Sequence, residues 1–161
     1  WVLCTVILLC SCSSKKYQSA AKEVLNECLI VAQDSESMCN LIAKTWSNAI
    51  FDDVDYYGYY CSDFNRALQQ MRSVKSDEIE LLSTSRALLI EKVGKMKPPK
   101  SYIMMHNDLM ELVTLTSSFS RLATDPSGSL QSFRNNFQEM DEEILRKTEA
   151  FEIKYASELK R

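Results

Sequence analysis

The sequence predicts an all-α protein, an elongated antiparallel four-helix bundle with up-down-up-down topology that follows an apolar N-terminal segment. Only three glycines and three prolines occur in 161 residues, so turn signals are few and the elements between them are long. Apolar residues recur at steps of three, four or seven along most of the chain, which is the spacing of an amphipathic helix. A three-helix bundle with an N-terminal stalk is the alternative arrangement.

The first half of the chain predicts two helices, over residues 17–51 and 60–96. The first has an apolar stripe of Ala21, Val24, Cys28, Val31, Met38, Ile42, Thr45 and Ala49. The second has predicted inward positions at Phe64, Leu68, Met71, Val74, Leu81, Leu82, Leu89 and Val93. Its middle, residues 75–80, is polar and shifts the register of the stripe, so we expect a kink near Ser76.

The second half predicts a helical hairpin. Pro98 and Pro99 end the second helix, because proline lacks the N–H that a helix interior requires. The third helix has inward positions at Tyr102, Met105, Leu109, Leu112, Thr116, Phe119 and Ala123. Residues 125–129 form a dense turn signal in which Ser129 is the expected N-cap. The fourth helix has inward positions at Leu130, Phe133, Phe137, Met140, Ile144, Phe151, Tyr155 and Leu159.

The N-terminal segment, WVLCTVILLCSC, is an apolar run followed directly by polar residues. We expect part of a signal to precede Trp1, because a basic region normally comes before such a run. Leu9-Cys10-Ser11-Cys12 resembles the lipobox of bacterial lipoproteins, which has a large aliphatic residue three places before the acceptor cysteine and a small residue next to it. Cys10 is the weaker acceptor, because the residue before it, Leu9, is large.

The lipobox resemblance implies that Cys12 is lipidated and that the protein is anchored to a membrane of the bacterial cell envelope, outside the cytoplasm. It divides the chain into a truncated signal peptide (1–12), a short tether (13–18) and a helical bundle domain (19–161). Two alternatives are a secretory peptide cleaved elsewhere and an uncleaved membrane anchor, since a span needs about 20 apolar residues.

A tyrosine-rich segment separates the first two predicted helices. Tyr56, Tyr57, Tyr59 and Tyr60 are candidate binding residues for another envelope protein or a glycan, because tyrosine combines a large contact area with a polar tip. The alternative is that some of these rings cap the end of the core.

The same segment has a partial calcium-loop pattern. Asp53, Asp55 and Gly58 fall on the first, third and sixth positions of an EF-hand-like loop. Tyr57 and Phe64 stand where oxygen ligands are required, which argues against calcium.

Residues that commonly carry catalysis or hold metals are scarce. His106 is the only histidine, and it lies beside the apolar stripe of the third helix, so we expect a flanking, half-exposed residue. A di-iron site is excluded because it needs a Glu-x-x-His on each of two helices. Cys28, Cys39 and Cys61 are expected to be buried free thiols. We therefore predict no catalytic residue, no metal and no cofactor.

Charge narrows the possible partners. The net charge is -3, so nucleic acid is not an expected partner. Lys92, Lys95, Lys97 and Lys100 surround the two prolines and would make one end of the molecule basic. They could meet a phosphate-rich surface such as anionic lipid, or they could complement the helix dipole and be otherwise solvated.

Together these features predict a membrane-tethered, non-enzymatic lipoprotein that acts as a binding module of the cell envelope. A structural envelope spacer or scaffold is one alternative. The layout is similar to that of uncharacterised small helical envelope lipoproteins, some of which act in phage exclusion or immunity, and this is a second alternative. An enzyme would need a mechanism that uses carboxylates alone.

Overall fold

The computed structural model describes the backbone of residues 2–159 and the side chains of residues 14–159. Within this part every regular element is helical, which confirms the predicted all-α class. The elements are α1 (Val2–Phe51), α2 (Phe64–Val74), α3 (Ser76–Lys95), the short 3-10 helix η1 (Lys100–Tyr102), α4 (Ile103–Thr124), α5 (Leu130–Lys154) and α6 (Ala156–Leu159).

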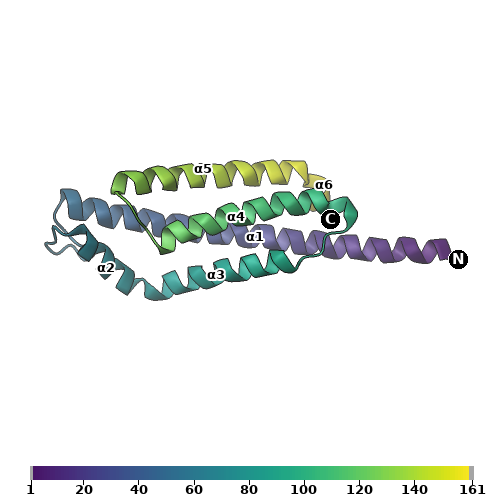
Figure 1. Cartoon of the computed structure of the whole chain (residues 1–161), viewed down its shortest axis with the longest axis horizontal. Helices are drawn as coiled ribbons and strands as arrows, with labels where there is room; N and C mark the ends of the chain where they lie inside the picture. The colour runs from purple at the N-terminus through teal and green to yellow at the C-terminus, as the bar shows by residue number, and fades with distance from the viewer. Residues whose placement is uncertain (1, 160–161) are drawn as a thin grey trace.

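The molecule is elongated along α1, whose 50 residues make a rod ~75 Å long at the usual helical rise. α4 packs on α1 most extensively, and α3 and α5 each contact both α1 and α4. No contact joins α3 to α5 in the described part of the chain, so these two helices flank the α1–α4 pair. α3 and α5 run in the direction opposite to α1 and α4 (Figure 1).

The two ends of this helical body contain different connections, and we call them the proximal end and the distal end. The proximal end contains the α3–α4 connection (residues 96–102) and α6, and the N-terminal part of α1 projects beyond it (Figure 1). The distal end contains the α1–α2 connection (residues 52–63).

The core follows the predicted stripes closely in α1 and α4. All eight predicted inward residues of α1 are buried, and six of the seven in the third predicted helix are buried, with Tyr102 half-buried. The second predicted helix fits less well, because Phe64, Val74 and Leu81 are exposed. The helix breaks at Lys75, one residue before the expected kink, and the break resets the face that α3 turns inward. Leu82 is buried in place of its neighbour Leu81.

Helix starts depend on local caps. Asp63 caps α2 by accepting hydrogen bonds from the N–H groups of Asn65 and Arg66, so α2 begins later than predicted. Ser129 is the N-cap of α5, as predicted, in a reciprocal capping box with Ser132.

The packed body starts at Tyr17, inside the segment predicted as a tether. Tyr17 and Gln18 are buried, and α1 is helical on both sides of them. The Tyr17 ring packs on Tyr102 with centroids 5.3 Å apart, and the Gln18 amide donates to the Tyr102 hydroxyl at 2.9 Å. These contacts hold the α3–α4 connection against α1.

Candidate functional site

The tyrosine loop, residues 52–63, is an ordered connection at the distal end. The Asp55 N–H donates to the Tyr59 carbonyl at 2.8 Å, and the Gly58 N–H donates to the Asp55 carbonyl at 3.1 Å. Val54 and Tyr60 pair as an isolated antiparallel bridge. Gly58 has a φ of 83°, which an L side chain rarely adopts, so glycine permits this turn.

Asp55 organises the loop from inside. Its side chain is buried, and its Oδ1 accepts hydrogen bonds from the N–H groups of Tyr57 and Tyr59, both at 2.9 Å. A short acidic side chain that binds the backbone of the residues just after it is a common way to fix a turn. Asp55 is therefore committed to the loop backbone.

The four candidate tyrosines divide into two groups. Tyr56 is half-buried and packs against the core, which agrees with the core-capping alternative for this residue. Tyr57, Tyr59 and Tyr60 are 58%, 71% and 81% exposed. The rings of Tyr56 and Tyr57 meet edge to face at 5.3 Å, and those of Tyr57 and Tyr59 lie 6.4 Å apart. The loop thus exposes three large aromatic rings to solvent.

We name the exposed side chains Phe51, Tyr57, Tyr59 and Tyr60 the distal aromatic patch. Phe51 ends α1 immediately before the loop and is 72% exposed. The sequence predicts Phe51 only as the last residue of a helix, because its exposure follows no periodic pattern. Near the C-terminal end of the loop, Cys61 is buried and packs with Ala49 and Ala67. Its N–H donates to the Asp53 carbonyl at 2.6 Å.

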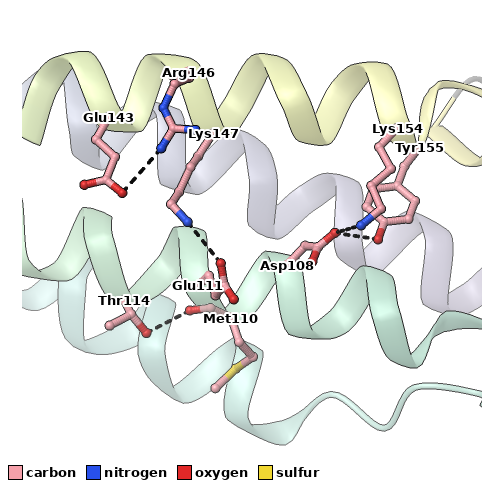
Figure 2. A network of polar contacts seen from close by, with 9 residues as sticks. All are labelled: Asp108, Met110, Glu111, Thr114, Glu143, Arg146, Lys147, Lys154 and Tyr155. Atoms are coloured by element: carbon pink, nitrogen blue, oxygen red, sulfur yellow. Dashed lines mark hydrogen bonds and ion pairs between the residues drawn. The ribbon is translucent and has the colours of Figure 1, made fainter.

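Apart from the tyrosine loop, a cluster of polar side chains links α4 to α5 (Figure 2). Lys154 and Tyr155 converge on Asp108, with the Lys154 Nζ and the Tyr155 hydroxyl both 2.6 Å from the carboxylate. Lys147 donates to Glu111 at 3.0 Å further along the same helix pair. Burial raises the pKa of Asp108, but the hydrogen bonds from Lys154 and Tyr155 outweigh it and hold the pKa below its usual value. These contacts fix the pairing of α4 with α5.

His106 is half-buried on α4, as predicted. Its ring lies edge-on to Tyr17, with centroids 6.2 Å apart, and burial lowers its pKa. The neighbouring aromatic ring makes this residue part of the packing at the proximal end.

The three thiols in the described part of the chain, Cys28, Cys39 and Cys61, are free and buried, which confirms that prediction. Burial raises the pKa of Cys28 and Cys39 to about 12, so these thiols stay protonated and unreactive at neutral pH.

The four predicted basic residues do not act as one group. Lys92 pairs with Glu23 and Glu27 at 2.7 and 2.6 Å, and Lys95 pairs with Glu91. Lys97 and Lys100 are exposed.

Cys12 lies outside the residues whose side chains the structure describes, so its lipidation stays a prediction. Across the described residues, no helix has both the length and the apolar character needed to cross a membrane. The same residues contain no group of three or more His, Cys, Asp or Glu side chains arranged to hold a metal ion. No protein-family model, curated protein or solved structure matches this chain.

Proposed function

We propose that this protein is a lipoprotein of the bacterial envelope, tethered at Cys12, that works by binding a partner through the distal aromatic patch. The helical body, in this proposal an up-down-up-down four-helix bundle, holds the patch away from the membrane. The observation that carries the proposal is the exposure of Tyr57, Tyr59 and Tyr60 on a loop whose backbone is fixed by the buried Asp55.

Rigid presentation favours binding. Tyrosine has few rotatable bonds for its size, and a loop ordered before contact loses little conformational entropy on association. Exposed aromatic rings are common at the centres of protein interfaces. The partner class that suits this patch is a protein or glycan surface with apolar faces and hydrogen-bonding groups for the tyrosine hydroxyls.

The position of the patch also supports the proposal. Phe51 lies ~58 Å along α1 from Cys12 at the usual helical rise. A lipid anchor at one end and a contact surface at the other would let the protein reach a partner well outside the headgroup layer.

The binding role is tested with the triple variant Tyr57→Ser/Tyr59→Ser/Tyr60→Ser. Because these side chains are exposed, we expect its thermal unfolding to match the wild type while capture of a defined species from envelope extract is lost. A matched control, Leu81→Ser/Leu88→Ser/Leu145→Ser, removes three exposed apolar side chains elsewhere and should retain capture. Equal capture by the wild type and the tyrosine variant would refute the patch as the contact.

The anchor is tested in the full-length gene with Cys12→Ala. We expect this variant to leave the membrane fraction and to lose labelling by a clickable palmitate. Labelling at the wild-type level would contradict lipidation at Cys12.

A structural spacer is the second candidate function, and the length of α1 favours it. It predicts that the tyrosine variant supports normal envelope integrity, whereas a variant shortened within the helical body does not. A binding module predicts that the tyrosine variant does not support normal envelope integrity.

A further inference from the structure

We propose that the proximal end of the body rests directly on an anionic lipid surface through Lys15, Lys16, Lys97 and Lys100, which we name the proximal basic patch. This inference rests on the proposed lipid anchor and adds a second membrane contact to it. It also gives the molecule an orientation that an anchor alone does not provide.

Tertiary packing brings the four lysines to one end. Lys15 and Lys16 directly precede Tyr17 on α1, and Lys97 and Lys100 flank the two prolines of the α3–α4 connection. The contacts of Tyr102 with Tyr17 and Gln18 hold that connection against α1 at this level. Lysines more than 80 positions apart in sequence therefore lie at the same end of the body.

The charges of this patch are available to a ligand. All four lysines are exposed, and none takes part in the ion pairs found among the described side chains. Lys92 and Lys154, which also lie toward this end, are instead paired with carboxylates. Of the acidic residues toward this end, Asp108 is paired with Lys154, and Glu152 and Glu158 lie on α5 and α6.

Exposed apolar side chains adjoin the lysines. Ile103 and Met104 occupy the first turn of α4, directly after the connection, and are 48% and 67% exposed. Lysines beside exposed aliphatic groups suit a bilayer interface, where the amines meet lipid phosphates and the aliphatic groups enter the acyl boundary.

The short distance along α1 between Cys12 and the proximal basic patch would allow this membrane contact. Tyr17 lies ~7.5 Å along α1 from Cys12 at the usual helical rise. The Debye length is about 8 Å at physiological ionic strength, so a lipid on Cys12 would place the patch within the field of anionic headgroups. Because the packed body begins at Tyr17, no long tether would hold the patch away from the surface.

The charge at the other end favours the same orientation. Asp52, Asp53 and Asp63 are exposed in the tyrosine loop, and an anionic surface repels them. Attraction at the proximal end and repulsion at the distal end together turn the distal aromatic patch away from the membrane.

The test uses the mature chain of this proposal, residues 12–161, as a Cys12→Ser variant, so that neither the apolar segment before Cys12 nor an attached lipid contributes to binding. Its cosedimentation is measured with vesicles of phosphatidylglycerol and phosphatidylcholine, and with vesicles of phosphatidylcholine alone. We expect binding to the anionic vesicles, weakened by salt. Each lysine near an anionic surface strengthens binding about fivefold, so Lys97→Glu/Lys100→Glu should weaken it by about 25-fold or more.

A matched control separates local charge from total charge. Lys44→Glu/Arg134→Glu makes the same change in net charge at exposed positions on α1 and α5, away from the patch, and should bind like its parent. Equal affinity of both double variants, or equal binding to neutral vesicles, would overturn the proposal. Lipidation is measured separately by palmitate labelling, so failure here leaves the proposed anchor standing.

Discussion

The two ends of the molecule use tyrosine in opposite ways. At the proximal end Tyr17 and Tyr155 are buried, and Tyr102 is half-buried and hydrogen-bonded to Gln18. At the distal end Tyr59 and Tyr60 are mostly exposed, on a loop whose order comes from Asp55 and the backbone rather than from burial of these rings. The proximal tyrosines thus close the core, whereas Tyr57, Tyr59 and Tyr60 at the distal end are available for contact.

The largest expected effect separates a buried ring from an exposed one. Tyr17→Ala should lower the free energy of unfolding by about 3 kcal/mol, because it removes a buried aromatic ring. Tyr59→Ala should change it by less than about 0.5 kcal/mol, because that ring is exposed. Urea denaturation of the two variants measures the difference. Similar losses in both would mean that the distal rings are structural.

The next effect tests how the distal loop is ordered. Asp55→Ala leaves the N–H groups of Tyr57 and Tyr59 without their acceptor and should destabilise the protein by about 1–3 kcal/mol. Asp55→Asn keeps an acceptor oxygen and should cost clearly less. Hydrogen exchange of residues 52–63 should accelerate in the alanine variant. Unchanged exchange there would show that the loop is held by other contacts.

The smallest effect concerns the α4–α5 contact near the proximal end. The pKa of Asp108 is lowered, so its contribution to stability is present above the ordinary pKa of aspartate, 3.8, and is lost as pH falls through the lower pKa of the folded state. The pair with Lys154 is partly exposed, and Asp108→Asn should cost less than about 1 kcal/mol at neutral pH.

Thermal melts of the wild type and the Asp108→Asn variant between neutral and acid pH measure this effect. The wild type should lose more stability than the variant as the pH falls. A variant that loses as much stability as the wild type would show that Asp108 does not contribute to the acid sensitivity.

Local and periodic features could be predicted from the sequence. The α1 stripe follows from helical spacing, the break at Lys75 from a change of register, and the Ser129 cap from a turn signal. Each depends on residues close together in the chain.

Non-periodic and tertiary features could not be predicted. The role of Asp55 depends on loop hydrogen bonds that have no repeating pattern, and the same bonds decide which tyrosines are exposed. The pairing of Lys92 with Glu27 joins residues far apart in sequence, so the sequence could not show that this lysine near the prolines is neutralised by a carboxylate. Likewise, burial of Tyr17 depends on Tyr102.

The most direct test of a two-ended molecule is its orientation on a membrane. The lipidated chain is reconstituted in anionic vesicles, and a fluorophore is attached through Ser101→Cys or Tyr59→Cys while the buried native thiols stay unlabelled. Energy transfer to acceptors in the lipid headgroups should be strong from position 101 and weak from position 59, because the distal loop would stand ~60 Å away. Equal transfer from the two positions would mean that the body lies flat on the membrane, and it would contradict the account.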